Sequence, residues 1–102
     1  MPNRVCLLTR DLVFRSRLGG VVAAAGGEVT RDAAACELAV IEIESVDWEG
    51  QIRILQSHGV PVLAFGAHVN AERLRQARAL GAVAVPNSQV EQRLAELLAG
   101  QQ

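Results

Sequence analysis

Residues 60–65 read VPVLAF, an apolar run that is bounded by Gly59 and Gly66. A short run without polar alternation is typical of a strand that is buried on both faces of a sheet. Pro61 is tolerated near the start of such a strand, where its missing N–H leaves no ladder bond unmade. The run therefore predicts an inner strand of a sheet that is covered on both sides.

Two more runs of the same kind precede it, RVCLL at residues 4–8 and LAVIEI at residues 38–43. The shorter segments EVT at 28–30 and AVAV at 82–85 predict two further strands. Between these runs, apolar residues recur every three or four positions, which predicts amphipathic helices. The expected helices span residues 12–25, 47–57, 71–80 and 88–99, and residues 32–37 have room for one or two helical turns at most.

Polar residues that favour helix N-caps stand at the predicted helix starts. Their side-chain oxygens can accept hydrogen bonds from the free N–H groups of the first turn. The predicted caps are Asp11, Asp47, Asn70 and either Asn87 or Ser88.

The alternation of strands and helices predicts the architecture. Such strands are joined by right-handed crossovers, so we expect a parallel sheet with helices on both faces. A chain of 102 residues has the size of one domain, and we expect a single domain over residues 1–102. In sheets of this kind ligands bind at the carboxyl ends of the strands. The residues that directly follow each strand are therefore the candidates for function.

The charged residues restrict the function. All ten basic residues are Arg, and the formal net charge is −1. A chain without Lys has no Schiff-base or Walker-type lysine, and the balanced charge argues against a nucleic-acid partner. No G-x-G-x-x-G motif follows the first strand, which argues against a dinucleotide cofactor.

Other features concern the compartment. No apolar run reaches the roughly 18 residues of a membrane-spanning helix, and no small-residue cleavage site follows the first apolar run. Cys6 and Cys36 form no C-x-x-C pair, so we expect reduced structural thiols and no metal site. These features predict a cytoplasmic protein with no membrane partner and no cofactor.

Three phrases, in the right order and spacing, resemble the receiver domains of response regulators. ELAVIEI at 37–43, GVPVLAFGA at 59–67 and ALGAVAV at 79–85 are similar to the family's third strand, its fourth strand and its approach to the fifth. The resemblance covers nearly the whole chain. It implies a three-layer, flavodoxin-like (CheY-like) α/β fold with a five-stranded parallel sheet in the order 2-1-3-4-5. Segment 32–37 stands where the family has its second helix, which we therefore expect to be shortened.

The departures from the family fall on its phosphorylation residues. Glu42 stands where receivers have the phosphate-accepting Asp, and Thr9 and Arg10 replace the acidic pair that holds Mg²⁺. Gly66 replaces a Ser or Thr, and the family's Lys near the fifth strand has no counterpart. The expected degenerate phosphoacceptor pocket comprises Thr9, Arg10, Asp11, Glu42, Gly66, Asn87 and Ser88.

These changes argue against phosphorylation chemistry. Mg²⁺ takes several oxygen ligands, and Arg10 puts a permanent cation where the metal would lie. The longer side chain of Glu42 moves its carboxylate away from the in-line geometry that phosphoryl transfer requires. We therefore expect no metal, no catalytic residue and no phosphorylation cycle.

A more specific hypothesis concerns what replaces the metal cluster. A guanidinium and a carboxylate can pair through two hydrogen bonds, so we expect an ion pair between Arg10 and Glu42. Glu42 would then resemble a permanently charged substitute for a phosphorylated Asp. The alternative is that Glu42 points into solvent and Arg10 pairs with Asp11 or with nothing.

The leading functional hypothesis is a phosphorylation-independent pseudo-receiver, not an enzyme, that acts in bacterial signalling through protein–protein contacts. The resemblance implies that the helix at 71–80, the strand at 82–85 and the last helix carry partner binding and dimerisation, here as a homodimer. The predicted interaction face contains Arg73, Arg75, Arg78, Val85, Glu91 and Arg93. The alternatives are a small-ligand-binding domain or enzyme that uses the strand-end crevice, and a purely structural self-assembly module.

The roles of Trp48 and of segment 32–37 are the last expectations from the sequence. Trp48, the sole Trp, is either a core anchor of its helix or part of an exposed contact surface. The short segment 32–37 is expected to leave one face of the sheet partly uncovered, which would offer a docking site.

Overall fold

The computed structural model describes residues 4–100, and its strands agree with the five predicted ones to within two residues at each end. The strands are β1 (Arg4–Leu8), β2 (Glu28–Thr30), β3 (Leu38–Glu42), β4 (Val62–Gly66) and β5 (Val83–Pro86). The helices are α1 (Leu12–Ala24), α2 (Trp48–Ser57), α3 (Ala71–Ala79) and α4 (Val90–Leu98). Short 3₁₀ turns, η1 (His68–Asn70) and η2 (Asn87–Gln89), precede α3 and α4.

The five strands form one parallel sheet in the order β2-β1-β3-β4-β5, which confirms the predicted topology. The middle strand β3 pairs Val40 with Leu7 on one side and with Leu63 on the other. Nearly every residue of β3 and β4 is buried, as their uninterrupted apolar sequences predict.

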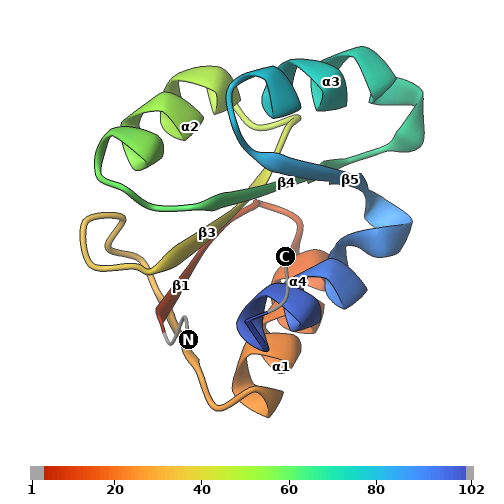
Figure 1. Ribbon diagram of the computed structural model, residues 1–102. Helices are drawn as coiled ribbons and strands as arrows, with labels where there is room; N and C mark the ends of the chain where they lie inside the picture. Colours follow the sequence, from red (N-terminus) through yellow and green to blue (C-terminus); the bar gives the residue numbers. More distant parts are fainter. Residues whose placement is uncertain (1–3, 101–102) are drawn as a thin grey trace.

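The sheet separates two layers of helices, with α2 and α3 on one side and α1 and α4 on the other (Figure 1). Successive strand residues point to opposite layers. Ile41 and Ala64 therefore pack toward α2 and α3, whereas Val40 and Leu63 pack toward α1 and α4. Trp48 is buried in the first of these clusters. It is therefore a core anchor of α2, not an exposed contact residue.

The segment between β2 and β3 forms turns, so the helical turns expected at residues 32–37 are absent. Oδ1 of Asp32 accepts the N–H of Ala34 at 2.9 Å, and Oγ1 of Thr30 accepts the N–H of Asp32 at 3.2 Å. The N–H of Ala35 donates to the carbonyl of Asp32 at 3.1 Å, which closes one turn. So short a segment between β2 and β3 gains too few hydrogen bonds to offset the cost of starting a helix. Within residues 4–100 the fold therefore has four helices, and the layer that contains α2 and α3 lacks a third helix beside β2.

Asp11 caps α1 as predicted, because its Oδ1 accepts the N–H groups of Val13 and Phe14 at 2.9 and 3.1 Å. The predicted side-chain cap at Asp47 is wrong. Asp47 does occupy the N-cap position of α2, but its backbone is left-handed with a φ of 56° and its side chain makes no cap bond. Its carboxylate lies against Gly50 in the first turn, where a Cβ atom would be 2.5 Å from Oδ2 of Asp47, but it accepts no N–H of that turn.

The other two predicted side-chain caps are also wrong. Asn70 precedes α3, but its amide donates to Oε1 of Glu44 at 2.7 Å instead of capping the helix. Asn87 and Ser88 lie in the turn η2, and α4 begins only after that turn. The 3₁₀ turn adds a tighter first turn to the helix, which shifts the N-cap beyond both residues.

Both cysteines are buried free thiols in the cluster that faces α2 and α3. Burial raises the pKa of Cys6 and of Cys36 above the ordinary thiol value of 9.0. The neighbouring Cys36 raises the pKa of Cys6 further. Both thiols are therefore protonated, and poorly nucleophilic, at neutral pH.

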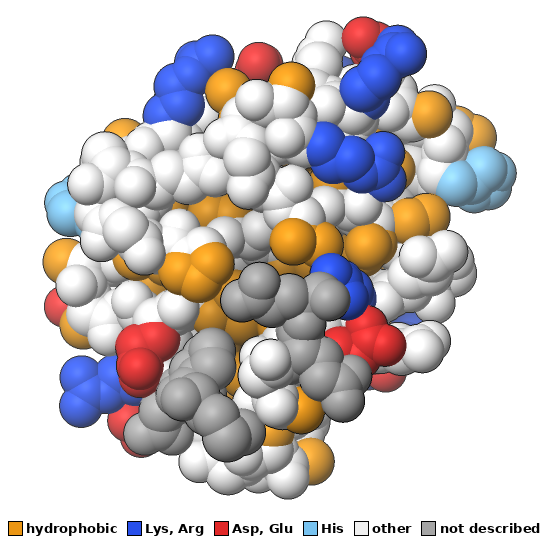
Figure 2. Space-filling view, in the orientation of Figure 1, with side chains coloured by type: hydrophobic (Ala, Val, Ile, Leu, Met, Phe, Trp, Pro, Cys, Tyr) orange, Lys and Arg blue, Asp and Glu red, His pale blue; other side chains and the backbone are white. Residues whose placement is uncertain are grey.

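Acidic and basic side chains are interspersed on the face shown in Figure 2, with no large area of one sign. Hydrophobic side chains gather toward the middle of that face. Over residues 4–100 we find no helix with the length and apolar character that crossing a bilayer requires.

Candidate functional site

The carboxyl ends of the parallel strands lie along one edge of the sheet. Strand pairing sets Glu42 beside Phe65 and Gly66 beside Pro86. Thr9 directly follows β1 on the other side of β3. The backbone thus brings the ends of β1, β3, β4 and β5 to one place, and the side chains decide what that place can do.

The central contact at this edge joins Thr9 and Glu42. The hydroxyl of Thr9 donates to Oε1 of Glu42 at 2.6 Å, and the same oxygen of Thr9 accepts the N–H of Asp11 at 3.1 Å. Thr9 is 7% exposed and is the one polar residue that is buried in the described part of the chain. The bond therefore connects the loop that enters α1 with the end of β3.

The predicted ion pair between Arg10 and Glu42 is wrong. Among residues 4–100, Arg10 makes no ion pair or hydrogen bond with a side chain, and Asp11 is occupied as the cap of α1. Glu42 is half-buried and takes its hydrogen bond from Thr9. A short hydroxyl that already points at the carboxylate loses less side-chain entropy than a long, hydrated guanidinium would.

The side chain of Ile43 fills the space beside Gly66 where a larger residue would place its side chain. A Cβ atom placed on Gly66 would lie 2.4 Å from Cγ1 and 2.7 Å from Cδ1 of Ile43, which is fully buried. The N–H of Ile43 donates to the carbonyl of Phe65 at 2.9 Å, which extends the pairing of β3 with β4 past Glu42. No hydroxyl side chain fits at position 66 unless Ile43 moves.

Asn87 and Ser88 follow β5 at the same edge. The amide oxygen of Asn87 is buried and has no hydrogen-bond partner among residues 4–100, whereas Ser88 is exposed. An unpartnered buried acceptor is destabilising by itself. Asn87 is therefore a polar group that the described chain leaves unsatisfied.

The residues at this edge do not fit the magnesium ion that the family binds. No group of three or more His, Cys, Asp or Glu side chains within residues 4–100 is arranged to hold a metal. Asp11, the nearest acidic residue after β1, uses its carboxylate as a helix cap. Arg10, beside it, is a permanent cation.

The residues of the predicted interaction face have different surroundings. Arg73 and Arg75 on α3 are exposed, and Arg75 pairs with Glu72 one turn earlier. Arg78 anchors α3 to β5, because its Nε and Nη2 donate to the carbonyl of Ala84 at 3.2 and 2.8 Å. Arg73 is the member of this helix whose guanidinium has no partner in residues 4–100.

The remaining members of the face lie on β5 and α4. Val85 is 9% exposed and packs in the cluster beneath α1 and α4, so it supports the face from inside. Glu91 pairs with Arg17 of α1, and Arg93 pairs with Glu96 at 3.1 Å. The polar residues of α4 are therefore mostly engaged within the chain.

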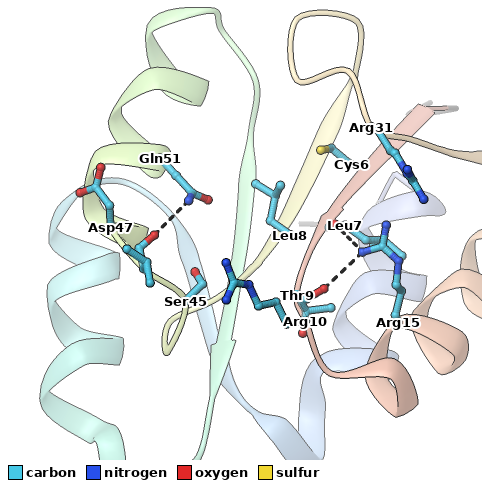
Figure 3. Close-up of a pocket in the computed structure, with 11 residues that line it drawn as sticks. Cys6, Leu7, Leu8, Thr9, Arg10, Arg15, Arg31, Ser45, Asp47 and Gln51 are labelled. Atoms are coloured by element: carbon cyan, nitrogen blue, oxygen red, sulfur yellow. Dashed lines mark hydrogen bonds between the residues drawn. The ribbon is translucent and has the colours of Figure 1, made fainter.

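Beside this edge lies a pocket of about 530 Å³, on the side of the sheet where no helix follows β2. Thr9 and Arg10 line it together with Arg15, Arg31 and Gln51, which the sequence did not single out. Figure 3 shows these side chains around Leu8, contributed by α1, by the turns after β2 and by the start of α2. The signal for the pocket was the short segment 32–37, which predicted an uncovered part of the sheet.

Comparison with known proteins was made by sequence and by structure. No family model matches the sequence, and no curated protein matches it. By structure, the response regulator receiver domain protein (CheY-like) of Methanospirillum hungatei superposes with a TM-score of 0.72 and 16% identity. That alignment covers 99% of this chain and 97% of the other. The fold is that of a CheY-like receiver domain.

Two longer proteins contain the same fold. DrrB of Thermotoga maritima, an OmpR/PhoB homologue, matches with a TM-score of 0.77 and 14% identity over 100% of this chain. NtrX of Brucella abortus, solved in complex with ADP, matches with a TM-score of 0.73 and 18% identity over 97% of this chain. The chain spans 55% of DrrB and 27% of NtrX. At these sequence identities the structural similarity shows the receiver fold and no more. The function must therefore be argued from the residues of the site.

Proposed function

We propose that this chain is a receiver-like signalling module that works without phosphorylation and acts through contacts with other proteins. The observation that carries the proposal is the closed strand-end edge, where Ile43 covers Gly66 and Thr9 binds Glu42. Each of these contacts fills, with the chain's own side chains, a place that phosphoryl chemistry would need.

The electrostatics support the same proposal. Phosphoryl transfer depends on cations that neutralise the charge on the transferred group. This chain contains no Lys, and its acidic residues offer no metal cluster within residues 4–100. Glu42 carries a carboxylate that is already hydrogen-bonded. We infer that Glu42 is a constant charge at the end of β3, not a phosphate acceptor.

The hydrogen bond from Thr9 to Glu42 supports a constitutive form of the module. In a switch, a contact at the strand ends forms in one state and breaks in the other. Here the contact joins two side chains of the chain itself and forms without a phosphate, and it links the loops after β1 and β3. We infer a module with one dominant state, whose regulation does not pass through phosphate.

The surface proposed for protein contacts is formed by α3, β5 and α4. It would bind a protein partner in the cytoplasm of a bacterium, or a second copy of the chain. Arg73 and Arg75 are its exposed cationic side chains, and Arg78 holds α3 against β5 to give the surface a fixed shape. We expect the partner to be neither a nucleic acid nor a membrane, in keeping with the net charge of −1.

A phosphorylation assay tests the first half of the proposal. The purified chain is incubated with Mg²⁺ and acetyl phosphate, and its intact mass and Trp48 fluorescence are recorded. We expect neither a phosphorylated mass nor a saturable change in fluorescence. The variant Glu42→Asp is the matched control, and we expect it to remain unphosphorylated because Ile43 and Arg10 are unchanged. Phosphorylation of the wild-type chain would contradict the proposal.

Sedimentation tests the second half. If the surface of α3, β5 and α4 mediates self-association, Arg73→Glu weakens the dimer, because it reverses an exposed charge on that surface. Arg53→Glu reverses an exposed charge on α2 and should leave the dimer unchanged. Equal effects of both variants would assign the association to net charge and would contradict the proposed surface.

A further inference from the structure

The pocket beside the strand ends has the dimensions of a ligand site. Its volume of about 530 Å³ lies within the range of roughly 300–1,000 Å³ that is usual for small-molecule pockets. It is bounded by β1, by the start of α1, by the turns after β2 and by the start of α2. The turns of residues 31–37 leave it open where another helix would cover the sheet.

The pocket carries an excess of positive charge. Arg10, Arg15 and Arg31 line it, and Asp47 is its one acidic lining residue. None of these three guanidinium groups forms an ion pair with a carboxylate in residues 4–100. The formal charge of the lining residues is therefore 3 − 1 = +2, with cations that the chain itself does not neutralise.

One of the guanidinium groups is held in place by the backbone. Nη1 of Arg15 donates to the carbonyls of Leu7 and Thr9 at 3.3 and 3.2 Å. These bonds orient the planar group, and its other N–H donors are left for a ligand. Figure 3 shows the ends of Arg15 and Arg31 near one another on one side of Leu8, and the end of Arg10 on the other side, toward Ser45.

The rest of the lining is neutral and partly apolar. Leu8 and Val46 supply apolar surface, and Cys6 lies beneath it, 1% exposed. Burial raises the pKa of the Cys6 thiol, which therefore carries no charge near neutral pH. Gln51 also lines the pocket, but its Nε2 donates to the carbonyl of Val46 at 3.0 Å and ties α2 to the preceding loop. An apolar lining between cationic groups suits a ligand that is apolar in one part and anionic in another.

We propose that this pocket binds a small organic oxyanion, a phosphate or carboxylate group carried on an apolar body. Arg pairs with both groups in the same planar geometry. Arg15 and Arg31 would hold the oxyanion on one side of Leu8, Leu8 and Val46 would contact the apolar body, and Arg10 would add positive charge on the other side. The inference concerns binding alone, requires no Mg²⁺, and stands apart from the interaction surface on α3, β5 and α4.

The test uses phenyl phosphate and benzoate as probes, with inorganic phosphate and neutral benzyl alcohol for comparison. Amide chemical shifts of the labelled chain are followed during each titration without Mg²⁺. We expect saturable shifts at the residues that line the pocket with at least one aromatic anion. Tighter binding of phenyl phosphate would identify the oxyanion as phosphate, and tighter binding of benzoate would identify it as carboxylate. Inorganic phosphate should bind more weakly than phenyl phosphate, because it has no apolar part.

Variants separate a specific site from a general attraction to a positive surface. Arg31 is exposed, so Arg31→Ala should fold normally and weaken binding by roughly tenfold or more, as expected for a lost charged hydrogen bond. Arg53→Ala removes an exposed Arg outside the pocket and should leave binding unchanged. Equal weakening by both variants, equal binding of benzyl alcohol, or shifts that never saturate would each overturn the proposal.

Discussion

The hydroxyl of Thr9 lies 2.6 Å from Oε1 of Glu42 and donates a hydrogen bond to it. The sequence resemblance predicts that Thr9 corresponds to one of the acidic metal ligands of receivers and Glu42 to their phosphate acceptor. The structure shows a hydrogen bond between these two side chains, and this bond joins the loops that follow β1 and β3.

Removing the hydroxyl of Thr9 tests how much this bond contributes. Thr9→Val keeps the shape of the side chain but leaves Glu42 and the N–H of Asp11 without their partner. We expect the free energy of unfolding to fall by about 1–3 kcal/mol, measured by urea denaturation. Thr9→Ser retains the hydroxyl and should lose less. A Thr9→Val variant as stable as the wild type would show that water replaces the bond without loss.

The contact between Ile43 and Gly66 predicts a destabilised variant. Gly66→Ala introduces a Cβ atom 2.4 Å from Cγ1 of Ile43, and overpacking of this kind costs about 1–3 kcal/mol. In the background of Ile43→Ala, which removes both Cγ1 and Cδ1, we expect Gly66→Ala to be less harmful than in the wild type. Denaturation of the two single variants and the double variant measures this coupling.

A second glycine provides the control for that experiment. Gly20 lies in the middle of α1, is exposed, and a Cβ atom there would meet nothing within 4 Å. Gly20→Ala should therefore stabilise the chain by up to about 1 kcal/mol, because Ala favours a helix. If both Gly→Ala variants shifted stability in the same direction, the contact with Ile43 would not be the cause.

Two variants test how much the cap of α1 contributes to the free energy of unfolding. Asp11 accepts two N–H groups of α1, so Asp11→Ala should cost about 0.5–2 kcal/mol. Asn70 also stands at a helix N-cap but makes no cap bond, so Asn70→Ala should cost less than Asp11→Ala. Thermal unfolding of the two variants compares them directly. A larger loss for Asn70→Ala would show that its bond to Glu44 outweighs a helix cap.

The buried thiols predict a loss of stability at alkaline pH. Burial raises the pKa of Cys6 and Cys36 above 9.0 in the folded chain, so the unfolded chain gives up these protons at lower pH than the folded one. The stabilisation is fully present below 9.0 and is lost as the pH rises through the higher, folded-state pKa values. The chain has no Lys and no Tyr, so no other side chain titrates in this window except Arg at still higher pH.

Denaturation at a series of pH values checks this prediction. We expect the free energy of unfolding to decrease steadily above pH 9.0. The double variant Cys6→Ala/Cys36→Ala lacks both thiols, and its stability should be lower overall but nearly independent of pH there. The same slope in the double variant would mean that the thiols are not responsible.

The apolar runs were sufficient to predict the five strands, whereas their order in the sheet was implied by the resemblance to receiver domains. β3 and β4 are buried on both faces except at Glu42, so their other positions are apolar, and this pattern is visible in LAVIE and VLAFG without a structure. The cap at Asp11 was also predictable, because a cap depends on residues two and three positions away. Such features are local in the chain, and the sequence therefore determines them by itself.

Contacts between distant residues were decided by the tertiary structure. Nothing in the sequence ranks Thr9 above Arg10 as the partner of Glu42, since the choice depends on which side chain is buried at the end of β1. The side chain of Ile43 reaches Gly66 only because β3 and β4 are adjacent and in register.

The same limit applies to the pocket. Arg15 and Arg31 are 16 residues apart in the chain, and both line one cavity because the segment after β2 forms turns that leave this part of the sheet uncovered. Hydrophobic periodicity is a property of neighbouring residues and is written in the sequence. The hydrogen-bond partner of a polar side chain depends on which groups from distant parts of the chain lie within reach. Only the folded structure determines that.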